Sequence, residues 1–245
     1  MLKTYTAYLA NKLIKNLYET NDVTYGLIRK LLSSYDGNEK PIIEEFVNHL
    51  NSLKRIDTMP VNTHKIDYIT DSIGIKPTNV LDIGAGKGII LSGVKQFYGL
   101  STENVYALDL QPIERKDITV IGYDENMKIP LEDNSIDLII MLSLLHHVED
   151  RKQLLLEVVR VLSPNGRVII REHDDDKTKL FYIFIQLMHY VWYEYNNESR
   201  DPLVMMSHKE LISLFKSVGL TSVNYIKPVG FNIQKLYGEV FKKIN

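Results

Sequence analysis

The segment at residues 80–88, Val-Leu-Asp-Ile-Gly-Ala-Gly-Lys-Gly, brings one carboxylate and three alternating glycines together. Its apolar start predicts the end of a buried strand, and Ile89, Ile90 and Leu91 begin the apolar stripe of a helix. A glycine turn between a strand and a helix lets the backbone approach a ligand closely, and the first N–H groups of the helix point at that ligand. The segment therefore predicts a site for a nucleotide-like ligand.

Two other glycine-rich nucleotide loops do not fit this segment. A Walker A loop needs G-x-x-x-x-G-K-[ST], and no such string surrounds Lys87. A dinucleotide fingerprint needs G-x-G-x-x-G/A, but Ile89 stands three residues after Gly86. The spacing D-x-G-x-G-x-G instead resembles motif I of the class I S-adenosylmethionine (SAM)-dependent methyltransferases. The cofactor contacts that this resemblance implies are Asp82, Gly84, Ala85, Gly86 and Gly88.

A second acidic residue follows the next apolar run. Residues 105–108, Val-Tyr-Ala-Leu, predict a short strand that leads into Asp109. A carboxylate at the carboxyl end of the second strand can accept hydrogen bonds from both ribose hydroxyls of a bound adenosine. The resemblance adds Leu110, and Leu142 at the end of the fourth strand, to the expected cofactor contacts.

The adenine contact is expected in the segment from Gly122 to Asp137. This segment resembles the family pattern G-D-A-x-x-L-P-F-x-D-N-S-F-D, with one extra residue before Asp133. In that family the first acidic residue binds the exocyclic amine of adenine. The resemblance implies this role for Asp124 with Met127 beside it, and the extra residue leaves Glu125 as the alternative.

The longest match to the family follows an apolar strand at residues 137–142. Its sequence, LHHVEDRKQLLLEVVRVLSPNGRVII, resembles the signature L-H-H-x-x-D…L-x-x-x-x-R-x-L-x-P-G-G. Residues 151–162 predict an amphipathic helix, residues 164–166 a turn and residues 167–172 the fifth strand. Asn165 replaces the first glycine of the signature, and we expect it to tolerate the left-handed turn conformation.

Several imidazoles are expected at the ends of strands four and five, where ligands bind in open α/β sheets. The methyl group of SAM is already activated, so a general base is needed only when the acceptor atom carries a proton. The candidate bases are His146, His147 and His173, near Glu172. The alternative is a structural role, because family members with unlike substrates share the two histidines.

The same region contains possible ligands for a divalent metal ion, since Glu149, Asp150, Glu172 and Asp174 add hard oxygens to the imidazoles. However, Glu149 and Asp150 come just before a predicted helix, where acidic residues favour the helix dipole. Asp174 begins an acidic run that fits a solvated loop. We therefore expect no metal site.

Composition limits the remaining possibilities. The chain has 245 residues, enough for one domain with an extension, and a net charge of −2, which does not favour nucleic acid as a partner. It contains no cysteine, so disulfides and thiolate metal sites are excluded. A secretory signal and an apolar run of eighteen residues are also lacking. We expect a soluble cytoplasmic protein without a membrane span.

Three regions lie outside the family pattern. Residues 1–60 predict a helical extension, either a lid over the site or plain helical packing. Residues 174–206 predict an insertion over the substrate pocket, and its aromatic stretch at 178–195 is interpreted as pocket wall, with a homodimer face or a membrane-surface helix as alternatives. Ser207 and Glu210 fit a capping box for a helix that closes at Gly219. Strands near 222–227 and 235–241 complete the sheet.

These patterns predict an α/β protein with a Rossmann-like, doubly wound sheet of seven strands, six parallel and one antiparallel, over residues 61–245. The resemblance implies methyl transfer from SAM, with S-adenosylhomocysteine (SAH) as product, to a small-molecule acceptor. The alternatives are an RNA methyltransferase, including a cap enzyme, and a non-catalytic SAM-binding regulator. The N-P-P-[YFW] signature of adenine and glutamine methyltransferases is missing after strand four.

Overall fold

The computed structural model of the chain describes residues 63–123, 128–175, 185, 189, 203–227 and 236–244. The chain divides into two compact units, and the larger comprises Pro60–Asp174, Leu203–Gly230 and Leu236–Asn245. The sheet and the helices around it belong to this larger unit. The predicted helical extension and the aromatic stretch at 178–195, apart from Ile185 and His189, lie outside the described residues. The predicted domain boundaries stay predictions.

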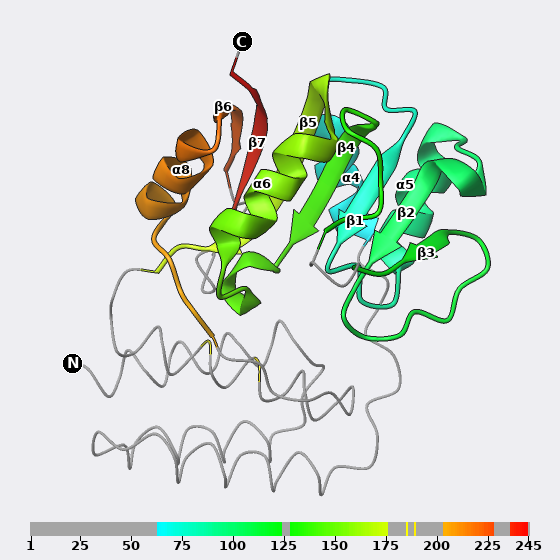
Figure 1. Ribbon diagram of the computed structural model, residues 1–245, viewed down its shortest axis with the longest axis horizontal. Coiled ribbons are helices and arrows are strands. Elements are labelled where there is room, and N and C mark those ends of the chain that lie inside the picture. Colours follow the sequence, from blue (N-terminus) through cyan, green and yellow to red (C-terminus); the bar gives the residue numbers. More distant parts are fainter. Residues whose placement is uncertain are drawn as a thin grey trace, which may run out of the picture. The chain divides into compact units, whose positions relative to one another are not determined.

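A seven-stranded sheet with the order β3-β2-β1-β4-β5-β7-β6 forms the centre of the fold (Figure 1). The first five strands pair in parallel, and β7 runs antiparallel to both β5 and β6. Six strands therefore run in one direction and β7 in the other, which confirms the predicted fold. The strands are β1 (Val80–Ile83), β2 (Val105–Leu108), β3 (Thr119–Ile121), β4 (Ile136–Leu142), β5 (Leu162–His173), β6 (Leu220–Ile226) and β7 (Leu236–Lys243).

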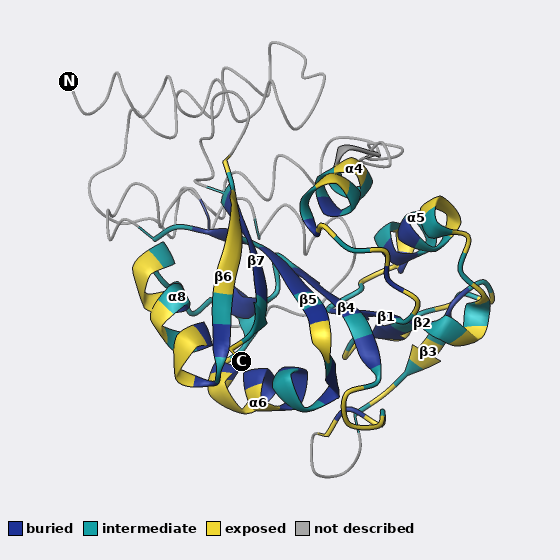
Figure 2. Cartoon of the chain, turned by 90° about the horizontal axis from the view of Figure 1, so that it is seen from above, coloured by how far each residue is buried: buried dark blue, intermediate teal, exposed yellow. Residues whose placement is uncertain are grey.

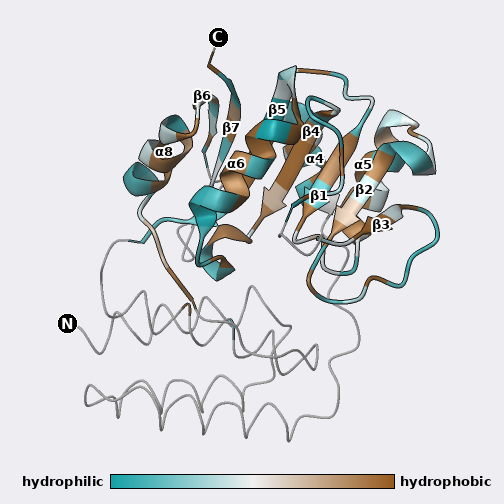
Figure 3. Ribbon diagram, in the orientation of Figure 1, coloured by the Kyte–Doolittle hydropathy of each residue, from teal (hydrophilic) through white to brown (hydrophobic). Residues whose placement is uncertain are grey.

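Helices cover both faces of the sheet, with α4 and α5 on one face and α6 and α8 on the other (Figure 2). Their bounds are α4 (Thr63–Ser72), α5 (Ile89–Tyr98), α6 (Arg151–Val161) and α8 (His208–Ser217), with the short 3₁₀ helices η1 (Thr102–Asn104) and η2 (Leu145–His147). Alternate residues of a strand feed the two apolar layers, so that Val80 packs toward α4 and Leu81 toward α6. The central strands are apolar because both of their faces are buried (Figure 3).

The fifth strand differs from the expected turn and strand. Ile136 of β4 pairs with Leu162, and Leu138 pairs with Arg167, so residues 163–166 form a bulge inside one continuous strand. Asn165 is not left-handed, because the non-glycine residues with positive φ in the described chain are Asn134 and Ser143. The expectation for Asn165 was wrong, since the extra residues bulge out of the ladder without reversing the chain.

Two helix starts were correctly located from the sequence. Ser207 and Glu210 form the capping box of α8, in which the Ser207 N–H donates to Glu210 Oε2 over 2.8 Å. The side chain of Asp150 accepts from the Gln153 N–H at the start of α6, over 3.0 Å. Within the described residues, no helix has the length and apolar character that crossing a bilayer requires.

Candidate functional site

The glycine turn after β1 adopts a backbone conformation that other residues rarely take. Gly84, Gly86 and Gly88 have φ values of 73°, 53° and 66°. The Gly84 N–H donates to the carbonyl of Leu108 over 2.8 Å, which ties the turn to the end of β2. The turn leads directly into α5, whose N-cap residue is Gly88.

The three glycines are needed for two different reasons. A Cβ on Gly84 would lie 2.8 Å from Leu144 Cδ1, and one on Gly88 would lie 2.5 Å from Ile118 Cδ1. Those two positions are closed by packing. A Cβ on Gly86 would meet no atom within 4 Å, so this part of the backbone faces open space. The turn therefore offers a ligand an accessible stretch of main chain between two packed supports, which fits the predicted cofactor.

Asp109 lies beside this turn. One carboxylate oxygen, Oδ2, accepts from the Gly86 N–H over 2.7 Å, and the other, Oδ1, accepts from the Gln111 N–H over 2.9 Å. Each carboxylate oxygen has a second lone pair, so the group can still accept from two hydroxyls. The next residue, Leu110, is 79% exposed and offers an apolar surface. The carboxylate oxygens of Asp109 therefore fit the hydroxyl groups of a ribose.

Asp82 occupies an unfavourable environment at the end of β1. Its side chain is buried, and burial together with the charge of Asp109 raises its pKa to about 8, with Lys65 acting in the opposite direction.

The strand next to β1 also ends beside the glycine turn. Leu142 ends β4, which pairs with β1, and is followed by Ser143 with a φ of 57°. Non-glycine residues in this region are strained and concentrate at functional sites. The predicted contacts Asp82 and Leu142 therefore flank the glycine turn.

The predicted adenine contacts Asp124, Glu125 and Met127 lie outside the described residues. The segment that follows them is clamped by α6. The Ile129 N–H donates to Glu157 Oε2 over 3.1 Å, and the Arg160 guanidinium donates to the carbonyls of Ile129 and Leu131 over 2.7 and 2.8 Å. Arg160 is the arginine of the L-x-x-x-x-R-x-L signature, and the sequence did not reveal this clamping role.

A buried pair of hydrogen-bonded side chains joins β5 to the turn after β4. His146 Nδ1 lies 2.6 Å from Glu172 Oε2, and both side chains are almost fully buried. The second oxygen, Glu172 Oε1, accepts from the N–H groups of Leu144 and Leu145 over 2.8 and 2.7 Å. Burial alone would raise the pKa of Glu172, but the imidazoles of His146 and His173 and the hydrogen bond from Leu145 hold it below its usual range. Glu172 is therefore a buried carboxylate that fixes both the imidazole and its turn.

The three predicted histidines come together. The ring centroids of His146 and His147 are 4.2 Å apart, and those of His146 and His173 are 5.1 Å apart. His146 and His147 belong to η2, and His173 ends β5. The parallel pairing of β4 with β5 brings these ends to one edge of the sheet. Of the contacts in this group, the one between His146 Nδ1 and the carboxylate of Glu172 is a side-chain hydrogen bond.

Arg151 and Val204 also fix the turn, and the sequence did not indicate this. Arg151 Nε donates to the carbonyl of Leu145 over 2.6 Å, and the guanidinium contacts the carbonyl of Val204. The Val204 N–H donates to the carbonyl of His146 over 2.8 Å. Arg151 comes from α6 and Val204 precedes α8, so their pairing needed the tertiary structure.

Tyr237 is a second residue without a signal in the sequence. It pairs with Glu172 across β5 and β7, and its ring centroid lies 4.4 Å from that of His208. Among the described residues, its hydroxyl is the buried side-chain polar atom that has no hydrogen-bond partner. Burial, with the charges of Glu172, Asp174 and Glu239, raises the pKa of this phenol far above its usual range.

The other acidic residues near the histidines have structural roles. Asp150 caps α6, and Asp174 Oδ1 accepts from the His208 N–H over 2.8 Å.

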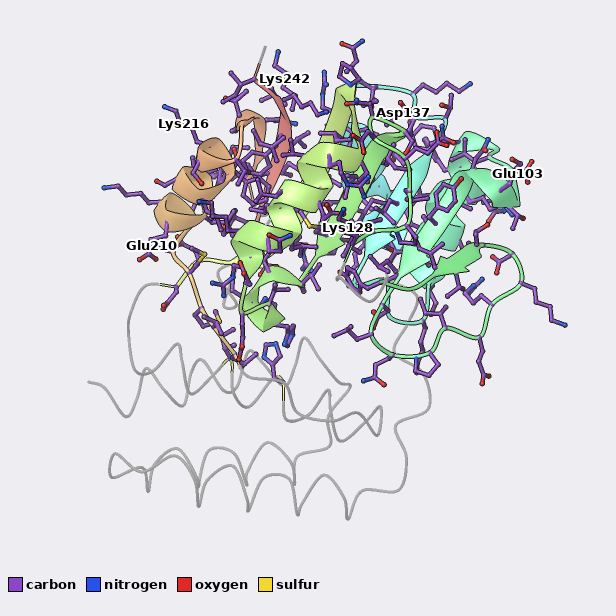
Figure 4. All side chains as sticks on the ribbon, viewed as in Figure 1. Glu103, Lys128, Asp137, Glu210, Lys216 and Lys242 are labelled. Carbon is purple, nitrogen blue, oxygen red and sulfur yellow. The ribbon has the colours of Figure 1, made fainter. Side chains whose placement is uncertain are left out.

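Asp137 has a structural role far from the histidines. Labelled in Figure 4, it lies near the start of β4, at the opposite edge of the sheet from the glycine turn. Its carboxylate accepts from Thr78 and Asn79, and from the hydroxyl of Ser163.

The sequence of this chain is similar to those of several methyltransferases. A methyltransferase-domain family model matches residues 81–170. A ubiquinone biosynthesis O-methyltransferase of Rickettsia prowazekii is 26% identical over 192 residues, covering 71% of this chain and 73% of the relative. The norajmaline N-methyltransferase of Rauvolfia serpentina is 30% identical over 113 residues, covering 42% of this chain and 38% of the relative.

A solved structure shares the fold. The 1,6-didemethyltoxoflavin-N1-methyltransferase of Burkholderia thailandensis, solved with its substrate and SAH, has a TM-score of 0.53 and 15% sequence identity. The alignment covers 83% of this chain and 88% of that one.

Proposed function

Because this chain belongs to the class I SAM-dependent methyltransferases, we propose that it methylates a small molecule with an acidic hydroxyl, of the phenol or quinol type. We propose further that His146 is the general base that removes the proton of that hydroxyl. Within this class SAM supplies an activated methyl group. The residues of the chain bind and orient the two reactants and handle the proton.

The observation that carries the proposal is the pairing of His146 Nδ1 with Glu172 Oε2 at 2.6 Å. A carboxylate on Nδ1 favours the tautomer in which Nδ1 carries the proton, so that Nε2 is the basic nitrogen. The same carboxylate stabilises the imidazolium that forms when Nε2 takes a proton. Glu172 cannot turn away easily, because its other oxygen accepts two backbone N–H groups of the same turn.

Residues of suitable chemistry for SAM surround the glycine turn. The open backbone at Gly86 and the carboxylate of Asp109 fit an adenosine ribose, and exposed Leu110 fits a ring face. Asp82 and Leu142 lie at the ends of the strands that flank the turn. These residues would hold SAM at the edge of the sheet where β4 and β5 present the histidines.

The choice of a small hydroxylated acceptor is supported by two observations. One of the relatives that align over most of both chains is a ubiquinone biosynthesis O-methyltransferase, whose name states that it methylates oxygen. The chain has a net charge of −2, so its overall charge does not favour the binding of a polyanionic RNA. A hydroxyl of the phenol type also loses its proton to an imidazole more readily than an aliphatic alcohol does.

The test is methyl transfer from SAM labelled in its methyl group, with the full chain and a small set of acceptors. The set contains catechol, a reduced short-chain hydroxyquinol, an indoline and a capped RNA oligomer. We expect the labelled methyl group on an oxygen of catechol or of the quinol. Transfer of the label to the capped RNA oligomer instead would overturn the proposal. No transfer to any hydroxyl would also count against it.

The role of His146 is tested with His146→Gln, against His147→Gln and His173→Gln as matched changes. A general base contributes about 10²–10⁴ to the rate, so we expect kcat to fall by about that factor in the first variant alone. The dissociation constant of SAH should stay within twofold in all three. An equal loss in the three variants would show that the histidines act through packing.

A further inference from the structure

Tyr237 presents a buried hydrogen-bond donor that the fold itself does not use. Its side chain is 4% exposed, and within the described residues its hydroxyl is the buried side-chain polar atom that lacks a hydrogen-bond partner. Folded proteins leave few such groups unpaired, because burying a donor without an acceptor destabilises the fold. An unpaired hydroxyl at the ligand-binding edge of a sheet is therefore a candidate contact for a ligand.

The position of Tyr237 places it beside the proton-transfer residues. It pairs directly with Glu172 across the antiparallel strands β5 and β7, which lie side by side in Figure 1. Side chains of such a pair project to the same face of the sheet, with Cβ atoms about 4.5–5.5 Å apart. Glu172 is the carboxylate that holds His146 Nδ1 at 2.6 Å. The phenol therefore lies next to the residue that orients the proposed base.

The carboxylates on the other side of Tyr237 are fixed by other donors. Glu239 accepts a hydrogen bond from the hydroxyl of Ser222, and its Oε2 lies 3.0 Å from His208 Nε2. Asp174 Oδ1 accepts from the His208 N–H over 2.8 Å. The ring centroids of Tyr237 and His208 are only 4.4 Å apart, yet the phenol hydroxyl joins none of these hydrogen bonds.

The charges around this hydroxyl restrict the kind of atom that it can bind. Burial, with the negative charges of Glu172, Asp174 and Glu239, raises the pKa of the phenol far above its usual range. The hydroxyl therefore keeps its proton and acts as a donor. The same negative charges disfavour an anionic ligand group, so the matching atom is a neutral oxygen, such as that of a carbonyl, an ether or a second hydroxyl.

We propose that the hydroxyl of Tyr237 donates a hydrogen bond to a second, neutral oxygen of the acceptor, adjacent to the hydroxyl that is methylated. The inference rests on the proposed function and adds the residue that selects among hydroxylated acceptors. Because Tyr237 neighbours Glu172 and Glu172 holds His146, a small ring with oxygens on adjacent carbons suits both groups. An acceptor with a single oxygen leaves the buried hydroxyl unpaired and is disfavoured.

The test compares methyl transfer to catechol and to phenol by the full chain at saturating SAM, with and without the change Tyr237→Phe. Catechol has the second oxygen and phenol lacks it. We expect the unaltered chain to prefer catechol in kcat/KM by about tenfold or more. Tyr237→Phe should lose most of this preference, with kcat/KM for phenol kept within about twofold. The intrinsic reactivity of the two acceptors is the same for both proteins, so the change in the ratio reports the hydrogen bond.

Tyr225→Phe is the matched control, because Tyr225 is 50% exposed and its ring lies in the same group, 5.4 Å from that of His208 between centroids. It should leave the ratio unchanged. The inference also expects that Tyr237→Phe resists urea at least as well as the unaltered chain. A structural role for the hydroxyl would lower stability and activity together, and that result would contradict the inference.

An unchanged ratio of catechol to phenol in Tyr237→Phe would overturn the inference, and so would equal losses with both acceptors. No transfer to catechol would overturn it too, and transfer to the quinol would then show that the proposed function stands without it. If the chain methylated no hydroxyl at all, the proposed function would fail and the inference with it.

Discussion

Asp82 illustrates how a single residue in this site is held against its own preference. A buried carboxylate beside another carboxylate is costly to ionise, and Lys65 offsets only part of that cost. Tyr237 is a second example, since its buried hydroxyl has no partner within the described residues. Residues that destabilise the fold in this way are expected where a ligand supplies the missing interaction.

The first prediction concerns the pH dependence of stability caused by Asp82. Its pKa rises from 3.8 to about 8 on folding, so between these values the folded state holds more protons than the unfolded state. This residue therefore lowers stability as pH rises through that window. Asp82→Asn cannot ionise, and we expect its Tm to exceed that of the unaltered protein at pH 8.5 by on the order of 5 °C.

The check is thermal unfolding of both proteins at pH 5 and pH 8.5. The difference in Tm should be small at pH 5 and large at pH 8.5. A difference that is the same at both values would mean that Asp82 does not titrate in this range.

The second prediction concerns Tyr237. A buried hydroxyl without a partner costs about 1–3 kcal/mol, so Tyr237→Phe should raise the free energy of unfolding by about 1 kcal/mol. Tyr68→Phe is the matched control, because the Tyr68 hydroxyl donates to the carbonyl of Ile170, and its loss should be destabilising. Urea denaturation measures both changes. A loss of stability in Tyr237→Phe would show that its hydroxyl has a partner in solution.

At the scale of elements, β5 separates two kinds of chemistry by its alternation. Arg171 projects to the α4 face and Glu172 to the α6 face, so one strand end places a cation on one face of the sheet and a carboxylate on the other. Helix α6 has a comparable double role. Its apolar residues pack on the sheet, and Glu157 and Arg160 hold the segment that follows the predicted adenine contacts.

The third prediction tests that clamp. Arg160→Met removes hydrogen bonds to the carbonyls of Ile129 and Leu131, and we expect it to lower the free energy of unfolding by about 2 kcal/mol. It should also weaken SAH binding several-fold, because the clamped segment continues directly from residues 124–127. Lys152→Met, on the exposed side of α6, should alter neither quantity. Unchanged SAH affinity in a destabilised Arg160→Met would restrict the clamp to a structural role.

At the scale of the whole molecule, the strand order determines where the site forms. The order turns outward in both directions from β1 and β4, and ligands bind at such a switch point, beyond the carboxyl ends of the strands. The glycine turn follows β1, and Ser143 and the histidines follow β4 and β5. Residues far apart in the sequence therefore meet at one edge, although each is placed there by its own strand.

Most of the fold could be predicted from the sequence, because its signals are local. Continuous apolar runs indicate strands that are buried on both faces, and the glycine turn and capping box indicate their ends. The bulge at residues 163–166 was missed, since a turn and a bulge use the same residues and differ only in pairing with β4. Asn165 was misjudged for the same reason.

The sequence by itself determined the glycine turn, the carboxylate after β2 and the histidines after β4, because each is a short motif attached to the end of one strand. Only the tertiary structure decided which histidine meets Glu172, and where Arg160 and Tyr237 lie. Those relations depend on strand order and on side-chain direction across a sheet. Neither is recorded in the spacing of residues along the chain.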